Sequence, residues 1–145
     1  MIREATKEDI PRLLVMCRKF FAASEYADIT KLDEDAMTST LCGVIDNEQT
    51  CLLVPDDLTG MVAGIVYPFY FSTDVCAQEL FWWSEGGHGR ALLEAFEAWA
   101  KSRGANAVTM ICLDRLGRDR VESIYKKAGY RASEHSWIKR LSDGD

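Results

Sequence analysis

The chain has 145 residues, which is enough for one domain with one hydrophobic core. Hydrophobic residues make up 48% and charged residues 28%, and no apolar run approaches the ~20 residues of a membrane span, so we expect no membrane partner. The formal net charge of −6 argues against nucleic acid as the main partner, because domains that bind it are usually basic. Residues Met1–Glu4 lack the apolar segment of a signal peptide, which favours a cytoplasmic location.

The cysteines and histidines do not indicate a metal or a disulfide framework. The five cysteines are odd in number, widely spaced and free of C-x-x-C pairs. His88 and His135 lie far apart and have no other ligand residues near them in the sequence. We therefore expect free, mostly buried thiols and no metal cofactor.

The first half of the chain predicts a strand, two helices and then two strands. Thr6 and Asp9 resemble a helix start, and Asp33 begins a second helix whose apolar residues recur at helical spacing. The turn at 56–60 separates two β runs, and Pro68 marks a bend in the second of them. The expected ranges are strand 2–5, helix 6–21, helix 33–45, strand 50–55 and strand 61–71.

The second half predicts a strand, a glycine loop, a long helix, and then strand, helix and strand. Gly104 and Gly129 follow the two expected helices, where a helix commonly ends. The expected ranges are strand 75–84, a helix from the glycine loop to 103, strand 107–113, helix 118–128 and strand 130–141. The order β-α-α-β-β-β-α-β-α-β predicts a mixed α/β sheet in a single domain, 1–145.

The most informative segment runs from Glu79 through the glycines to Ala91. An apolar strand, a loop with Gly86, Gly87 and Gly89, and a helix N-terminus follow one another directly. Loop N–H groups and the positive end of the helix then point at one anion, and glycine lets a phosphate approach the backbone. The segment predicts a site for a phosphate-bearing ligand, although glycine clusters also form simple flexible turns.

Glu79 is the residue in this strand most suited to acid–base chemistry. It lies among apolar neighbours, and burial raises the pKa of a carboxyl group toward the range of a general base. The alternative is a solvent-facing position in an alternating strand. Trp82 and Trp83 are expected on opposite faces of that strand.

Two motifs and the element order resemble the GNAT superfamily of acyl-CoA-dependent N-acyltransferases. The segment 84–89 is similar to the family's Q/R-x-x-G-x-G/A loop, with Ser84 in place of Gln or Arg and Glu85 after it. The segment 124–130 is similar to its Y-x-x-x-G-[FY] motif, and 2–11 resembles its N-terminus. The resemblance implies a GNAT-like, mostly antiparallel sheet flanked by helices.

The resemblance also implies a co-substrate, a mechanism and a set of site residues. It implies an N-acetyltransferase that moves an acetyl group from acetyl-CoA to an amine by direct attack in a ternary complex. Glu79, or a water that it holds, would be the base, and Tyr125 would protonate the departing thiolate. The residues implied to bind the cofactor are Trp82, Trp83, Ser84, Gly86, Gly87, His88, Gly89, Arg90 and Ala91.

The acceptor side is less defined by the sequence. The resemblance places the region after the first helix beside the acceptor, with Phe21, Glu25 and Tyr26 as candidate contacts, while a solvated loop is the alternative. Small-molecule amines and protein amines both remain candidate acceptors, and a homodimer is compatible with the family. An inactive acyl-CoA-binding module and a nucleotide-phosphate binder are the alternative functions, although the P-loop motif is absent from the sequence.

Overall fold

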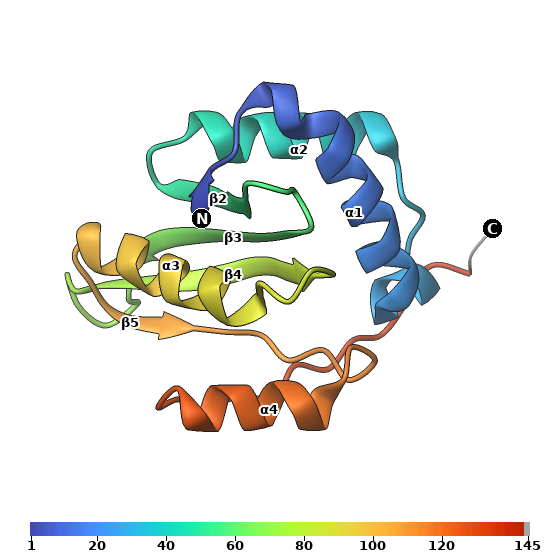
Figure 1. The fold of residues 1–145 in the computed structure, drawn as a ribbon. Coiled ribbons are helices and arrows are strands. Elements are labelled where there is room, and N and C mark those ends of the chain that lie inside the picture. Colours follow the sequence, from blue (N-terminus) through green and yellow to red (C-terminus); the bar gives the residue numbers. More distant parts are fainter. Residues whose placement is uncertain (144–145) are drawn as a thin grey trace.

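A computed structural model describes residues 1–143, and it has one five-stranded sheet with helices on both faces (Figure 1). The strands are β1 (Ile2–Glu4), β2 (Thr50–Pro55), β3 (Gly60–Pro68), β4 (Val75–Ser84) and β5 (Ala105–Thr109). The helices are α1 (Ile10–Ala23), α2 (Glu34–Asp46), α3 (Gly89–Ser102) and α4 (Arg118–Lys127), with short 3-10 turns η1 (Lys7–Asp9) and η2 (Glu25–Asp28).

The strands follow one another across the sheet in chain order. Neighbours from β1 to β4 pair antiparallel, whereas β5 pairs with β4 in parallel. The parallel pair is the one joined by a long crossover, which contains α3, because parallel neighbours cannot be joined by a hairpin. The predicted mixed, mostly antiparallel sheet is confirmed.

The sequence signals for helix ends are also confirmed. Asp33 accepts a hydrogen bond from the backbone N–H of Ala36 at 3.0 Å and so caps α2. The chain turns after α3 and α4 at Gly104 and Gly129, whose φ angles are 81° and 92°. These left-handed values favour glycine, which explains why both helices stop there.

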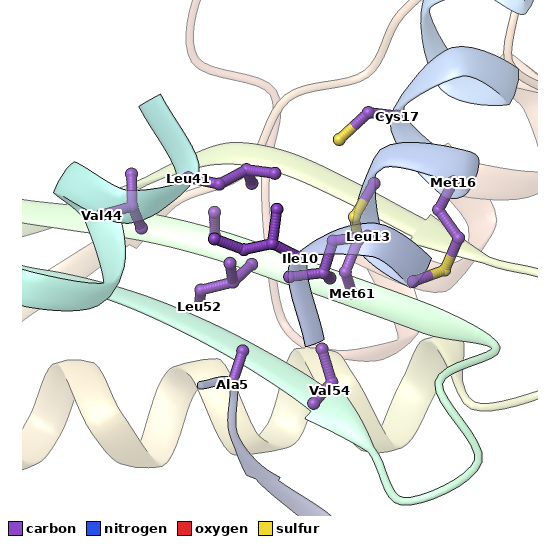
Figure 2. Packing of buried hydrophobic residues seen from close by; sticks show 11 residues of the cluster. Ala5, Ile10, Leu13, Met16, Cys17, Leu41, Val44, Leu52, Val54 and Met61 are labelled. Atoms are coloured by element: carbon purple, nitrogen blue, oxygen red, sulfur yellow. The ribbon is translucent and has the colours of Figure 1, made fainter. Parts of the chain in front are cut away.

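Alternation along the strands divides the core between the two faces of the sheet. Leu52 and Val54 pack with α1 and α2, as Figure 2 shows, whereas Leu53 and Val62 pack with α3. The period of two in a strand places consecutive side chains on opposite faces. Cys17 and Cys51 lie one in each cluster as free thiols, and burial raises their pKa values to about 11 and about 12.

Two strands end three or more residues before the predicted position, whereas β1 ends one residue early and α1 begins at Ile10, after η1, rather than at 6. β3 ends at Pro68 rather than at Phe71, since proline has no N–H to donate to the ladder. β5 occupies Ala105–Thr109 rather than 107–113, because its pairing with β4 ends at Gln78 and Thr109 and the chain then leaves the sheet.

The final strand predicted over 130–141 is wrong, since this segment has no regular secondary structure. Trp137 and Leu141 are 93% and 90% exposed, so neither lies against a core. A short segment forms a stable strand only where it both pairs with a neighbour and buries an apolar face, and this one does neither. Within residues 1–143, no helix has both the length and the apolar character needed to cross a membrane.

Candidate active site

The site forms where β4 and β5 separate. The last pair in their parallel ladder is Gln78 with Thr109. On the other side of β4, Gly64 pairs with Glu79 and Ala63 with Phe81, so Leu80 is an extra residue that bulges from the strand. The strand therefore changes direction at the point where it loses its parallel neighbour.

Glu79 lies at this separation and is only 5% exposed. One carboxylate oxygen accepts a hydrogen bond from the backbone N–H of Ile111 at 2.9 Å, in the gap that the ladder leaves. Burial raises the pKa of Glu79 from 4.5 to about 7, and the bonds from Ile111 and the Tyr125 hydroxyl oppose this rise. The carboxyl can therefore take up or release a proton near neutral pH.

Tyr125, which lies on α4, also bonds to Ile111. Its hydroxyl donates a hydrogen bond to the carbonyl oxygen of Ile111 at 2.5 Å. Its ring stacks on Trp82, with the ring centres 5.8 Å apart. Burial first, and then the nearby charge of Glu79, raises the pKa of Tyr125 above its usual value, so the hydroxyl keeps its proton at neutral pH.

A small cavity opens beside Glu79. Six of the seven residues that line it are apolar, and Glu79 is the exception. They come from α1, β4, the segment after β5, and α4. The lining residues are Phe20, Glu79, Trp82, Ile111, Leu113, Leu116 and Val121.

The glycine loop lies between β4 and α3, as predicted, and packs on the turn between β2 and β3. A Cβ added to Gly86 would lie 2.1 Å from Thr59 Oγ1, so a side chain is excluded there. Gly87 has a φ of 79°, which favours glycine. Among the described residues no side chain caps α3, and its first N–H groups face the end of this loop.

The two residues that depart from the family motif have structural roles. The Ser84 hydroxyl accepts a hydrogen bond from the backbone N–H of His88 at 3.1 Å, which closes the loop. The Glu85 carboxylate turns toward α1, where it accepts hydrogen bonds from Lys19 at 3.0 Å and from the Trp83 indole at 2.8 Å. Its negative charge is therefore directed away from the start of α3.

The two basic side chains of the loop are engaged by carboxylates. The His88 ring lies 3.0 Å from Asp57, and Arg90 donates to Glu94 at 3.2 Å on the surface of α3. The hydrogen bonds that Asp57 accepts from Thr59 and His88 lower its pKa to about 2. The donors that the structure leaves at this end of α3 are thus backbone N–H groups, including those of Gly89 and Ala91.

Trp82 and Trp83 lie on opposite faces, as predicted. Trp82 packs with the α3 cluster, and its indole N–H donates to the carbonyl oxygen of Gly89 at 3.2 Å. Trp83 packs with the α1 and α2 cluster, where it meets Phe20 edge-on. Trp82 thereby links the start of α3 to the Tyr125 ring.

The predicted acceptor residues lie at the end of α1 and in η2, away from the cavity lining. Phe20 lines the cavity, whereas Phe21, Glu25 and Tyr26 are absent from its lining. Beside them Asp28 forms an ion pair with Arg115, which joins η2 to the segment after β5. Within residues 1–143, no group of three or more His, Cys, Asp or Glu side chains is arranged to hold a metal ion.

The sequence did not indicate the residues that follow β5. Ile111 serves through its peptide groups, which carry no signal of residue type. Leu113, Leu116 and Val121 read as ordinary core residues, because only the separation of β4 and β5 exposes them to a cavity. A strand prediction that stopped at Thr109 would have left these residues unassigned and open to a site role.

Comparison with solved structures identifies the fold. The BH1408 protein of Bacillus halodurans is 19% identical, with a TM-score of 0.79 over 98% of this chain and 99% of its own. An acetyltransferase of Trypanosoma brucei is 14% identical, with a TM-score of 0.72 over 97% of this chain and 99% of its own. The aminoglycoside 6'-N-acetyltransferase of Acinetobacter haemolyticus is 13% identical, with a TM-score of 0.71 and 99% of both chains covered. The chain has the GNAT fold.

The GNAT fold is the fold that the resemblance of the segments 84–89 and 124–130 implied. The likeness extends over nearly the whole chain in each comparison, so it concerns the complete arrangement of elements rather than one motif. No family model and no curated protein matches the sequence.

Proposed function

We propose that the protein is an N-acetyltransferase that moves an acetyl group from acetyl-CoA to an amine by direct attack in a ternary complex. One observation carries this proposal. Where β4 and β5 separate, the buried carboxyl of Glu79, with a pKa of about 7, accepts a hydrogen bond from the backbone N–H of Ile111. The buried phenol of Tyr125 donates a hydrogen bond to the carbonyl oxygen of the same residue. Such a pair suits the deprotonation of an amine and the protonation of a thiolate.

The glycine loop and α3 fit the phosphates of acetyl-CoA. The start of α3 has no side-chain cap within the described residues, Gly87 is in the left-handed region, and Glu85 turns away. The backbone N–H groups of Gly87 and of Gly89 to Ala91 would therefore bind the pyrophosphate, since the His88 N–H already donates to Ser84, and Gly86 allows close packing on Thr59. Acetyl-CoA, when bound, supplies the activated acetyl group as a thioester.

Glu79 would act on the acceptor amine. An alkyl ammonium is protonated at neutral pH and cannot attack a carbonyl, so the amine must first lose a proton. The Glu79 carboxyl faces the cavity and titrates near 7, and it would accept this proton directly or through one water.

The backbone of β4 and the hydroxyl of Tyr125 would complete the transfer. The bulge at Leu80 takes that residue out of the ladder, so backbone N–H groups at this point would be available to polarise the thioester carbonyl. Tyr125 keeps its proton at neutral pH and would donate it to the departing thiolate.

Calorimetry and a thiol-release assay test the proposal together. The purified chain should bind acetyl-CoA saturably and should release CoA when an amine is added. Absence of binding at high micromolar acetyl-CoA would contradict the proposal. Saturable binding without CoA release across a broad amine panel would instead identify a non-catalytic acyl-CoA-binding module.

A further inference from the structure

The Trp82 side chain contacts two parts of the candidate site at once. Its indole N–H donates a hydrogen bond to the carbonyl oxygen of Gly89, the first residue of α3, at 3.2 Å. Its ring stacks on the Tyr125 ring, with the ring centres 5.8 Å apart and an angle of 25° between the planes. We propose that Trp82 is a positioning residue, which holds both the start of α3 and the hydroxyl of Tyr125 in place. This inference rests on the proposed acetyl transfer and assigns Trp82 a role within it.

The indole has little freedom to move. Trp82 pairs with Val62 in the antiparallel ladder of β3 and β4, beyond the bulge at Leu80, so its backbone is fixed. Its side chain packs against the buried cluster that includes Leu92 and Phe96 of α3. A tryptophan side chain has only two torsion angles, so the ladder, the packing and one hydrogen bond are enough to fix the ring.

The hydrogen bond at Gly89 bears on the proposed pyrophosphate site. The Gly89 carbonyl and the Arg90 N–H belong to one planar trans peptide unit, so they point in opposite directions. The indole N–H holds this carbonyl and therefore sets the direction of the Arg90 N–H. Donation to the carbonyl also makes that N–H a stronger donor, because linked hydrogen bonds polarise one another. Trp82 thus aligns one of the N–H groups that would bind the pyrophosphate.

The stacking at Tyr125 bears on the proposed acid. Tyr125 extends from α4 to the carbonyl of Ile111, and the face of the Trp82 indole lies along its ring. To protonate a thiolate, the hydroxyl has to leave the Ile111 carbonyl without losing its orientation. The stacked indole supports the ring without involving the hydroxyl, so the ring keeps its place while the hydroxyl changes partner.

A double-mutant cycle tests the effect at Tyr125. Trp82→Leu removes the stacked ring and should lower kcat for CoA release by about tenfold, measured with the amine that the wild type uses best. In a Tyr125→Phe background the same substitution should change kcat by less than about twofold, because no hydroxyl remains to be positioned. Equal losses in both backgrounds would overturn the inference, since a merely structural role of Trp82 does not depend on the Tyr125 hydroxyl.

The effect at Gly89 has a separate readout. Trp82→Phe keeps an aromatic ring but loses the N–H, so the dissociation constant for acetyl-CoA in calorimetry should rise about fivefold. Equal affinity in this variant and the wild type would overturn the inference. If melting curves show that Trp82→Leu does not fold, this measurement decides.

Trp99→Phe is the matched control for the affinity measurement. Trp99 belongs to the same buried cluster, but it stacks on Phe96 rather than on Tyr125. Its indole N–H has no hydrogen-bond partner among the described residues. The substitution therefore removes a buried indole without removing a contact to the site, and acetyl-CoA affinity and kcat should match those of the wild type.

The measurements separate the inference from the function beneath it. If the wild type releases no CoA with any amine, acetyl transfer itself is contradicted. If the wild type releases CoA but either Trp82 measurement gives the contrary result, acetyl transfer stands and the positioning role of Trp82 is wrong.

Discussion

Glu79 and Tyr125 are joined through a single residue, since Glu79 accepts the N–H of Ile111 and Tyr125 donates to its carbonyl oxygen. The carboxyl lies on β4 and the phenol on α4, so the segment between β5 and α4 fixes their spacing. The N–H and the carbonyl of Ile111 belong to two successive planar peptide units, and each unit holds one of the two side chains. The acid and the base therefore need little rearrangement before reaction.

Tyr125→Phe should lower kcat for CoA release by about a hundredfold, since a positioned general acid contributes about a hundredfold or more. The phenyl ring keeps the stacking on Trp82, so acetyl-CoA affinity by calorimetry should change little. Tyr130→Phe is the matched control, because its hydroxyl donates to Glu97 rather than to Ile111. Unchanged turnover in Tyr125→Phe would remove Tyr125 from the role of acid.

Glu79→Gln should stabilise the fold while it removes the base. The pKa of Glu79 is about 7 in the folded chain and 4.5 in the unfolded reference, so the stability from its protonated form is present below 4.5 and lost as pH rises through 7. Above pH 7 the variant should therefore be more stable than the wild type by about 3 kcal/mol in urea unfolding.

Glu94→Gln is the control for that comparison, because Glu94 is exposed and its pair with Arg90 lies on the surface. Its urea midpoint should stay near that of the wild type at every pH. A wild type whose stability does not fall between pH 5 and pH 8 would contradict the buried, titrating carboxyl.

Gly86→Ala should weaken acetyl-CoA binding. The new Cβ would meet Thr59 Oγ1 at 2.1 Å, so the loop must move away from the β2–β3 turn. A shift of this size should raise the dissociation constant by roughly tenfold or more in calorimetry. Equal affinity in the variant would show that the loop does not form the binding site.

Gly43→Ala is the matched control, because its added methyl group meets no neighbouring atom. Gly43 lies within α2, and no atom lies within 4 Å of an added Cβ. The substitution should stabilise the chain by about 0.5–1 kcal/mol, because alanine loses less backbone entropy than glycine in a helix. Its acetyl-CoA affinity should match that of the wild type.

Local signals in the sequence predicted most of the fold and the kinds of residue that form the candidate site. Glycines in a strand-to-helix loop, caps such as Asp33 and the opposed pair Trp82 and Trp83 each depend on neighbours in sequence. These features obey short-range rules of backbone conformation and periodicity, so the sequence alone was sufficient for them.

The features that sequence did not predict are set by tertiary structure. The bulge at Leu80 and the early end of β5 at Thr109 decide that Ile111 and Leu116 face the cavity. The segment 130–141 was expected to hold a strand, but it pairs with no strand of the sheet, although β5 is an edge strand. Pairing partners are not encoded by the pattern of one segment, which is why these predictions failed.

The central claim is that Glu79 deprotonates the acceptor amine. The pH dependence of amine-dependent CoA release tests it most directly, with hexylamine at a fixed acetyl-CoA concentration. The wild-type rate should rise with pH through a midpoint near 7, the pKa of Glu79, and Glu79→Gln should lose both the rise and most of the rate. A rate in Glu79→Gln that equals the wild type and keeps the same midpoint would contradict the account.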